Sequence, residues 1–444
     1  MNLESFKVSK LHGSMPDCKL LFTNNTLLLI GENGSGKTTL MKMLFYTLSA
    51  QWLKLLSYEF DSIEVVINAE TFFIKRAELE SLILDPQYLR TLPVMIRRRM
   101  SGNIDVDNLR ELCERYDIPI DMIFQEFENE ISEASDERQN NIINILRKLR
   151  RILKDTLILY LPTYRRIEQD LKVVLGDKVD DDNIRRRNAY MDFANRNYAE
   201  LVEFGMGDVD AVVKNTLATL RRSYGDSLNS LSLSYLSEII TERYKRVDNS
   251  YLNEIDEPTI LNVVDRVDET ILSMKEKQLL SEKILGFKNM TNIETDNDKV
   301  VCHYFEKLYQ THKDLKDREI QIRMFASICG KYFKNKEVLY DSSNFDFKIK
   351  PEFSDRPIDL GCLSSGEKQI AALFSLILLG NKNCFIIIDE PELSLSVKWQ
   401  RQFLEDIYKS PYCKGLFAVT HSPFIFDNEL DKYAHGMDEF RILK

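Results

Sequence analysis

The sequence predicts an α/β fold whose two parts are separated by a long, mainly helical insertion. Strand patterns occupy roughly the first 75 residues and return after residue 333, whereas turn-forming residues are scarce between them. The chain has only 16 glycines and 11 prolines in 444 residues, about half of average usage. Between Asp226 and Cys329 the single glycine is Gly286, and a stretch with so few turns favours long helices. These observations exclude an all-β sandwich, a collagen-like chain and a disordered chain.

The apolar pattern predicts where the individual elements lie. Thr26–Ile30 is an apolar run of the kind found in buried parallel strands, and a helix is expected from Thr38. Ile63–Ile67 and Thr71–Ile74 are expected to form a hairpin. The other expected strands are Leu3–Val8, Lys19–Phe22, Leu157–Leu161, Glu337–Tyr340, Phe345–Ile349, Cys384–Ile388 and Leu416–Thr420, and two expected C-terminal helices are Leu363–Gly380 and Trp399–Tyr408.

We expect the chain to be organised in five segments. Residues 1–75 form the first part of the α/β domain, 76–155 a helical segment, 156–200 a return to the domain, 201–332 the helical insertion, and 333–444 the second part of the domain. Within the insertion, no heptad repeat is sustained over several turns, so the pattern does not establish a long coiled coil. Helical spacing is kept by Ile260, Val263, Val264, Val267, Ile271 and Leu272.

Composition and charge narrow the functional classes. The net charge is −10, from 70 acidic and 60 basic residues, so bulk electrostatics does not attract the chain to nucleic acid. Seven scattered cysteines without a Cys-x-x-Cys pair argue against a disulfide framework or a zinc site, and a reducing cytoplasm is the expected location. No apolar stretch reaches the length of a membrane helix, and the N-terminus does not resemble a signal peptide.

A phosphate-binding loop is predicted after the third strand. Gly31–Thr38 fits G-x-x-x-x-G-K-[ST] between an expected strand and an expected helix. Glycines let backbone N–H groups surround phosphates, and the helix start adds a favourable dipole. Lys37 is expected to contact the β- and γ-phosphates and to act in catalysis, and the Thr38 hydroxyl to hold Mg²⁺. The other interpretation is a glycine-rich turn that fits by coincidence, which the flanking elements argue against. The expected nucleotide-binding residues here are Asn33, Gly34, Ser35, Gly36, Lys37, Thr38 and Thr39.

Two adjacent carboxylates end a later strand. Asp389 follows Ile386-Ile-Ile, where it is placed to bind Mg²⁺ directly or through water. Glu390 is placed as the general base that accepts a proton from an attacking water. In the alternative interpretation, Asp389 caps the strand and Glu390 is merely solvated. The presence of a phosphate loop in the same chain argues against this alternative.

The segment Leu363–Gln369, which reads LSSGEKQ, begins an expected helix with two hydroxyls and a glycine. These donors suit an anion, although an ordinary helix N-cap explains them equally well. The segment resembles the signature motif of ABC-type ATPases, with Ser365 where the commonest form has glycine. Pro391–Ser396 resembles the D-loop of that family, and Val419–Pro423 resembles its switch-histidine segment. All these motifs occur in the order typical of the family.

This resemblance implies a nucleotide site shared between two protomers. Lys37, Thr38, Asp389, Glu390 and His421 would act within one protomer, with His421 contacting the γ-phosphate and the attacking water. Without the family context, a lone histidine after an apolar strand is more often structural. The signature residues supplied by a second protomer would be Ser364, Ser365 and Gly366. At least a homodimer, with ATP and Mg²⁺ as cofactors, is therefore expected.

The distance between the motifs narrows the resemblance to one branch. More than 300 residues separate Lys37 from Leu363, far more than in compact transporter subunits, and long inserts at this place resemble the RecF, SMC and OLD group. Four segments resemble OLD-like ATPases: Leu161–Glu168, Leu201–Val209, Trp399–Gln400 and His421–Asp431. Within that group the chain most resembles the AriA-type ATPase subunits of PARIS anti-phage systems, with the Septu ATPases as neighbours.

The resemblance to PARIS-type subunits implies an oligomeric sensor or scaffold in anti-phage defence. Such an ATPase would respond to a phage-encoded trigger and control a separate effector, expected to be a Toprim-type nuclease. Only 23 residues follow His421, too few for the nuclease that OLD proteins carry there. The alternative is a RecF- or SMC-like ATPase clamp that binds DNA in repair.

Weaker candidates complete the sequence interpretation. Gln169 is the candidate for the glutamine that contacts Mg²⁺ in ABC-type sites, and Arg165–Arg166 are candidates for contacts to nucleotide or a partner. Cys362 is interpreted as a small buried residue without a chemical role. The basic runs are interpreted as solvated helix faces rather than phosphate-binding surfaces. They are Arg97–Arg99, Arg147–Arg151, Arg185–Arg187 and Arg221–Arg222.

Overall fold

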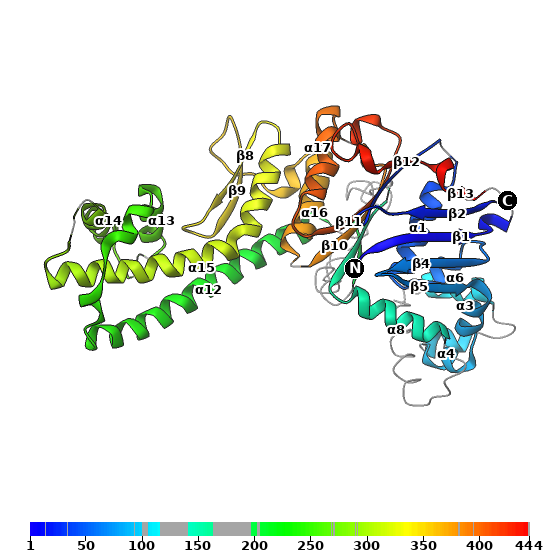
Figure 1. The fold of residues 1–444 in the computed structure, drawn as a ribbon, viewed down its shortest axis with the longest axis horizontal. Coiled ribbons are helices and arrows are strands. Elements are labelled where there is room, and N and C mark those ends of the chain that lie inside the picture. Colours follow the sequence, from blue (N-terminus) through cyan, green and yellow to red (C-terminus); the bar gives the residue numbers. More distant parts are fainter. Residues whose placement is uncertain are drawn as a thin grey trace. The chain divides into compact units, whose positions relative to one another are not determined.

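The chain forms two compact units in the computed structural model (Figure 1). The head unit comprises Met1–Gly205 and Asn381–Lys444, and the helical unit comprises Met206–Gly380. The structure describes residues 1–13, 15–32, 34–92, 94–99, 105–115, 141–162, 197–201, 205–267, 269, 271–288, 290, 292–380, 382–393 and 395–442.

The head unit contains two β-sheets and the helices that cover them. A six-stranded sheet has the order β12-β3-β11-β10-β6-β7, and all its neighbouring strands are parallel. A five-stranded sheet, β13-β2-β1-β4-β5, is antiparallel. The strands are β1 (Leu3–Ser9), β2 (Asp17–Leu21), β3 (Thr26–Ile30), β4 (Ser62–Ile67), β5 (Glu70–Lys75), β6 (Thr156–Leu161), β7 (Tyr198–Glu200), β10 (Asn383–Asp389), β11 (Cys413–Thr420), β12 (Ala434–Gly436) and β13 (Arg441–Ile442). The helices are α1 (Lys37–Leu48), α2 (Trp52–Leu55), α3 (Arg76–Ile83), α4 (Pro86–Thr91), α5 (Val94–Arg99), α6 (Val106–Arg115), α8 (Asn141–Leu153) and α17 (Val397–Tyr408).

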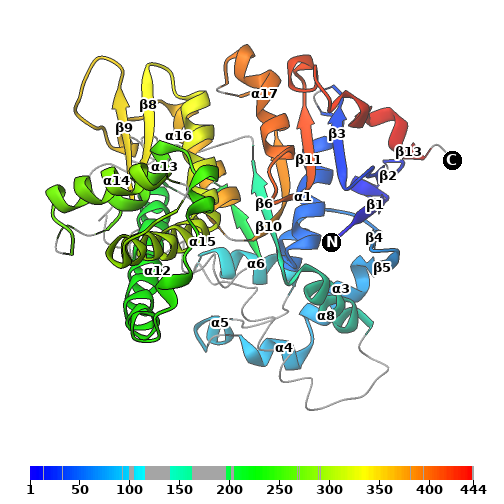
Figure 2. The same cartoon turned by 60° about the vertical axis from the view of Figure 1, so that its left-hand side comes forward.

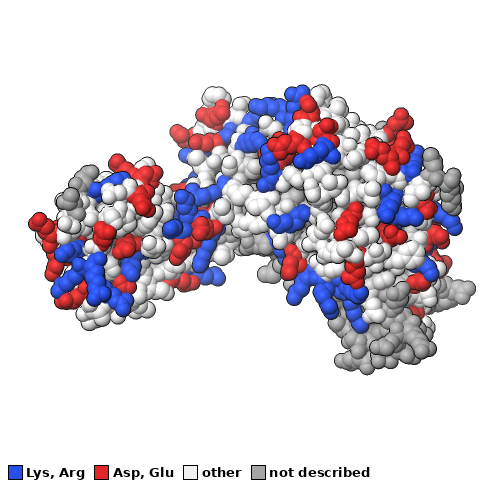
Figure 3. Space-filling view, viewed as in Figure 1, with Lys and Arg blue, Asp and Glu red and all other residues white. Residues whose placement is uncertain are grey.

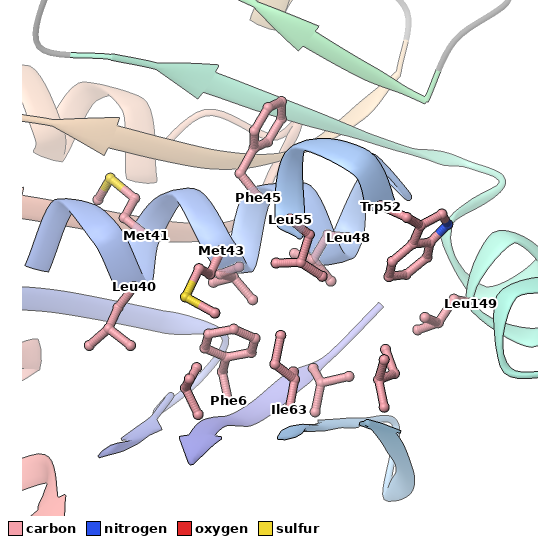
Figure 4. Packing of buried hydrophobic residues seen from close by; sticks show 14 of the residues in the cluster. Phe6, Leu40, Met41, Met43, Phe45, Leu48, Trp52, Leu55, Ile63 and Leu149 are labelled. Carbon is pink, nitrogen blue, oxygen red and sulfur yellow. The ribbon is translucent and has the colours of Figure 1, made fainter. Parts of the chain in front are cut away.

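Helix α1 lies between the two sheets and holds them in one core (Figure 4). Its apolar side chains are on more than one face, which a helix covered on both sides requires. Met41 and Phe45 are fully buried, as are Phe6 of β1 and Ile63 of β4, and Phe45 stacks on Tyr160 of β6 with ring centroids 4.8 Å apart. The helix that follows the phosphate loop is thus fixed by packing against both sheets.

The register of the parallel sheet brings three strand ends together. Ile30 at the end of β3 pairs with Thr420 at the end of β11, and Val419 of β11 pairs with Asp389 at the end of β10. Parallel strands place their carboxyl ends at one edge. The segments that follow β3, β10 and β11 therefore start side by side.

The helical unit is built around two long helices. Its elements are α12 (Met206–Ile240), α13 (Glu257–Asp265), α14 (Met274–Lys288), α15 (Asp296–Tyr332), β8 (Lys336–Asp341), β9 (Asp346–Pro351) and α16 (Ser365–Leu379). Helices α12 and α15 run side by side in opposite directions (Figures 1 and 2); the Tyr235 hydroxyl donates to the Val300 carbonyl at 2.7 Å. An apolar cluster joins both to α13 and α14. None of the helices in the described part of the chain combines the length and apolar character needed to cross a bilayer.

The predicted fold class is confirmed: a parallel-sheet α/β head is combined with a long helical region in the middle of the chain. The expected strands are present, with ends shifted by up to three residues. One helix is shorter than its pattern predicted: the helical spacing continued to Leu272, whereas α13 ends at Asp265. Val267 is nevertheless buried in the same cluster, since the turn after the helix carries it inward.

A buried ionic cluster fixes α15 within the helical unit. The Glu319 carboxylate accepts hydrogen bonds from Arg266 Nη2 at 2.8 and 2.9 Å, Arg323 Nη2 at 2.7 Å and the Tyr340 hydroxyl at 2.9 Å. The side chains of Glu319 and Arg266 are both fully buried. A buried pair is strongly destabilised when one partner alone is removed. The cluster therefore ties the turn after α13 and the first strand of the β8–β9 hairpin to one position on α15.

We expect Glu319→Gln to destabilise the helical unit by about 3–5 kcal/mol, because it leaves the buried Arg266 charge without its counter-charge. Thermal unfolding measures the loss. Arg323→Gln is the matched control and should have a smaller effect, since the Arg323 side chain is 41% exposed. The double variant Arg266→Met/Glu319→Met should recover most of the stability. Equal losses in the single and double variants would contradict this account.

Candidate active site

The candidate site lies at the edge of the parallel sheet where β3, β11 and β10 end. The phosphate loop follows β3, His421 follows β11, and Asp389 and Glu390 end β10. The three strands are adjacent in the sheet, so residues from positions 31 to 421 meet at one edge. The site residues expected within one protomer are all in the head unit.

The phosphate loop depends on glycine at two positions. Gly34 has φ of +78° and Gly36 has φ of +94°, a region that residues with a Cβ resist. Gly36 is also the N-cap of α1, so the turn directs the first N–H groups of α1 towards the loop. Ser35 lies between the two glycines, and Thr39 is in the first turn of α1. Asn33 lies outside the described residues.

The Lys37 ammonium lies inside the loop. Its Nζ donates to the carbonyls of Gly31 at 2.7 Å and Glu32 at 2.6 Å, and to Ser35 Oγ at 3.2 Å. Burial lowers the pKa of Lys37, whereas the charges of Asp389, Glu390 and Glu32 act to raise it. The cation is thus held where the backbone of the loop converges, within electrostatic reach of the carboxylates at the end of β10.

Thr38 and Asp389 form the part of the site that fits a divalent cation. Thr38 Oγ1 is 3.2 Å from Asp389 Oδ1, although the residues are 351 positions apart in sequence. Mg²⁺ prefers oxygen ligands at about 2.1 Å in octahedral geometry, which places adjacent ligands about 3 Å apart. The hydroxyl and the carboxylate therefore match two neighbouring positions around Mg²⁺ in both chemistry and separation.

Glu390 occupies a strained backbone position beside this pair. Its φ of 49° lies in the left-handed region, which costs a residue with a side chain about 1–2 kcal/mol. The Glu390 N–H donates to the Val419 carbonyl at 2.8 Å, which anchors it to β11. Burial raises the pKa of the Glu390 carboxyl, the charges of Asp389 and Glu392 raise it further, and His421 and Lys37 oppose this. A carboxylate with a raised pKa is a stronger base.

His421 is the first residue beyond β11, and its side chain is exposed. Its backbone N–H donates to Glu392 Oε1 at 2.8 Å, and the Thr420 hydroxyl donates to Glu392 Oε2 at 2.9 Å. Glu392 belongs to the D-loop-like segment, residues 391–396, whose residue 394 lies outside the description. No motif in the sequence assigns a role to Glu392. The only available signal was its place two residues after Glu390.

The signature segment is in the helical unit, at the start of α16. Ser364 is the N-cap, and its N–H and hydroxyl both donate to Glu367 Oε2, at 2.9 and 2.8 Å. Lys336 Nζ donates to Glu367 Oε1 at 2.8 Å. Although burial acts to raise the pKa of Glu367, these hydrogen bonds hold it below its ordinary value. Ser365 is exposed and Gly366 is buried in the first turn. The sequence pattern predicts the N-cap but not the ion pair between Lys336 and Glu367.

Several weaker candidates have no described structure: Gln169, Arg165–Arg166 and Arg185–Arg187 lie outside the described residues. Cys362 is exposed, so its interpretation as a buried residue was wrong; the segment before α16 is a short surface turn that gives it no apolar cover.

The described basic runs lie on helices of both units. Arg221 Nη2 donates to the Asn344 carbonyl at 2.9 Å, a contact within the helical unit. Arg147–Arg151 lie on α8 and Arg97–Arg99 on α5. On the face shown in Figure 3, basic side chains gather over α8 and over the outer end of α12, and both signs are interspersed elsewhere. The basic charge on this face is therefore local.

Comparison with known proteins agrees with a nucleotide-binding head. Residues 1–426 match the model of a family described as an AAA ATPase domain. No curated protein sequence matches the chain. One similar solved structure is the Smc head domain with an extended coiled coil, bound to the C-terminal domain of ScpA, from Pyrococcus furiosus (11% identity, TM-score 0.33, covering 96% of this chain and 91% of that one). Another is the SmcHead bound to the C-winged helix domain of ScpA (10% identity, TM-score 0.32, with the same coverage).

We expect Gly36→Ala to lower the free energy of unfolding by about 1–2 kcal/mol and to weaken nucleotide binding, because alanine resists the left-handed backbone. A Cβ at Gly36 meets nothing within 4 Å, so the effect is conformational rather than steric. Gly225→Ala in α12 is the matched control: it also has open space but lies in a regular helix, and should stabilise by about 0.5–1 kcal/mol. Thermal unfolding and nucleotide titration measure both; equal behaviour of the two variants would contradict the prediction.

Proposed function

Since the chain belongs to the AAA ATPase domain family, we propose that it hydrolyses Mg-ATP at the carboxyl edge of its parallel sheet. The observation that carries this proposal is the 3.2 Å approach of Thr38 Oγ1 to Asp389 Oδ1. It joins the phosphate loop to the acidic strand with the ligand chemistry and spacing that Mg²⁺ prefers. A coincidental glycine-rich turn has no reason to meet such a carboxylate.

The proposed roles follow from where the side chains lie. Lys37 and the N–H groups of the phosphate loop stabilise charge on the phosphoryl groups. Thr38 and Asp389 hold Mg²⁺, which neutralises phosphate charge when bound. Glu390 accepts a proton from the attacking water, a role that its raised pKa favours. His421, at the neighbouring strand end, faces the γ-phosphate.

A second copy of the chain completes the site in this proposal. The signature residues belong to the helical unit, whereas the residues above belong to the head unit. The N-terminus of α16 offers backbone N–H groups and the exposed Ser365 hydroxyl, which suit an anion such as a γ-phosphate. We place Ser364, Ser365 and Gly366 of one protomer against the nucleotide of another. ATP thereby links two protomers and hydrolysis separates them.

We expect Glu390→Gln to reduce ATP turnover to near background while the variant retains nucleotide, because glutamine keeps the shape but cannot accept the proton. The retained ATP should accumulate an oligomer on size-exclusion chromatography. Turnover, bound nucleotide and elution volume are the three measurements. Glu429→Gln, on an exposed side chain of the same unit, is the control and should behave as the original chain.

Adding Ser365→Arg to Glu390→Gln tests the shared site. The large cation at the start of α16 should block association while leaving ATP binding intact. Unchanged turnover in Glu390→Gln would overturn the proposed catalysis. An ATP-bound oligomer in the double variant would overturn the proposed role of the signature segment.

At the level of the cell, we propose that this ATP-dependent oligomer is a sensor or scaffold in anti-phage defence. Its partners would be a phage-encoded trigger and a separate effector, of which a Toprim-type nuclease is the proposed kind. The long helices of the helical unit offer surface for such a partner, and the motif resemblance to PARIS-type subunits supports the assignment. The net charge of −10 favours a protein partner over direct DNA binding.

Co-expression with neighbouring genes should yield a complex and toxicity that depends on Lys37. If neither appears, and purified chain instead binds DNA with a steep dependence on salt concentration, the defence role is overturned in favour of a DNA-binding clamp in repair.

A further inference from the structure

The D-loop-like segment and the switch-histidine segment are joined by one carboxylate. Glu392 accepts the Thr420 hydroxyl on Oε2 at 2.9 Å and the His421 N–H on Oε1 at 2.8 Å. Both oxygens of the side chain are therefore committed to two consecutive residues at the end of β11. Hydrogen bonds to a charged acceptor are among the stronger ones in proteins.

Gln400 of α17 adds a second connection between the same segments. Its Nε2 donates to the Leu395 carbonyl at 3.0 Å and to the Glu392 carbonyl at 3.3 Å. Its Oε1 accepts the Ser422 hydroxyl at 2.8 Å. One amide thus holds the Glu392 and Leu395 carbonyls on one side and the residue after His421 on the other.

Together these contacts fix the backbone of His421 while its side chain stays exposed. Thr420 is fully buried, and its hydroxyl is directed to Glu392. The N–H of His421 is directed to the same carboxylate, and Ser422 is held through Gln400. Among the described contacts, hydrogen bonds hold the side chains of Thr420 and Ser422, whereas none holds the His421 imidazole. Its position is therefore set by its backbone.

We propose that Glu392 is a positioning residue for His421, and that Glu392 and Leu395 move as one body with residues 420–422. This inference rests on the proposed ATP hydrolysis, in which His421 faces the γ-phosphate. A displacement of the D-loop-like segment, whose Leu393 is 41% exposed, then displaces the histidine. Contact between Leu393 and a second copy would thereby set the position of His421.

The competing explanation is that Glu392 only stabilises a surface loop. Under that explanation its removal lowers stability and leaves the turnover of folded protein unchanged. Under the proposal, removal leaves ATP binding intact and lowers kcat, because a displacement of about 1 Å in a catalytic group is enough for a loss of up to 100-fold. The split between kcat and KM separates the two.

The test compares four variants of the full chain with the original: Glu392→Ala, Glu392→Gln, Thr420→Val and Glu429→Ala. We expect Glu392→Ala to lower kcat by at least tenfold with KM changed less than threefold. Glu392→Gln keeps one acceptor oxygen and should recover part of kcat. Thr420→Val removes one of the two hydrogen bonds to Glu392, together with the one that Thr420 accepts from the Ser422 N–H, and its kcat should fall between that of Glu392→Ala and the original. Glu429→Ala removes an exposed carboxylate of the same unit and should match the original.

Amide hydrogen exchange supplies a measurement independent of activity. The N–H of His421 is protected by Glu392, so a peptide covering residues 416–423 should exchange faster in Glu392→Ala, with ATP absent. Thr420→Val leaves that hydrogen bond in place but removes the hydroxyl that accepts the Ser422 N–H at 3.0 Å. Exchange is therefore compared at the His421 amide itself, where Thr420→Val should have the smaller effect. A thermal unfolding scan of each variant ensures that turnover is compared among folded proteins.

Each outcome decides the matter. If the original chain hydrolyses ATP and Glu392→Ala has an unchanged kcat, this inference is overturned and the proposed function is not. Unchanged exchange in that variant does the same. An original chain that does not hydrolyse ATP overturns the proposed function, and the positioning role falls with it. Loss of kcat with faster exchange and partial recovery in Glu392→Gln supports the inference.

Discussion

Parallel pairing of β3, β11 and β10 is the constraint on which the rest of the site depends. The central residues of these strands are apolar and buried, so none of them offers polar groups for chemistry within the sheet. Functional side chains must therefore lie where the strands end, and parallel pairing places all three ends at one edge. The register, with Ile30 opposite Thr420 and Asp389 opposite Val419, aligns these ends. Core packing thus fixes the distance between Thr38 and Asp389.

Left-handed backbone occurs at three positions of this edge. Gly34, Gly36 and Glu390 all have positive φ, and the two glycines adopt it at little cost whereas Glu390 does not. The strain at Glu390 is sustained by the Val419 hydrogen bond and by the buried strand before it. Burial beside Asp389 also raises its pKa. The strands that hold Glu390 in an unfavourable backbone conformation thus also orient its carboxylate, and burial there makes the carboxylate a stronger base.

Local patterns were sufficient to predict most of the fold. The strands Thr26–Ile30 and Cys384–Ile388 were recognisable because a strand buried on both faces is apolar throughout. The contacts of Glu392 were not predictable, since a carboxylate in a loop has no pattern that identifies hydrogen-bond donors 28 and 29 residues away. Arg266 and Glu319 are likewise 53 residues apart, and only the packing of two helices brings them together. The candidate site residues were named from motifs, but their distances depend on strand order, which apolar runs alone do not specify.

Glu367 is an acidic residue that lies beside the proposed anion site at the start of α16. A carboxylate at the third position of a helix satisfies its N-cap but also places negative charge near the helix start, where a phosphate is proposed to bind. Lys336 of β8 neutralises that charge from within the same unit. Because the Ser364 hydroxyl donates to Glu367, the donors left for a phosphate are the exposed Ser365 hydroxyl and the first-turn N–H groups. The β8–β9 hairpin therefore contributes to the proposed anion site without touching the anion: it supplies the cation that lets a capped helix start attract a phosphate.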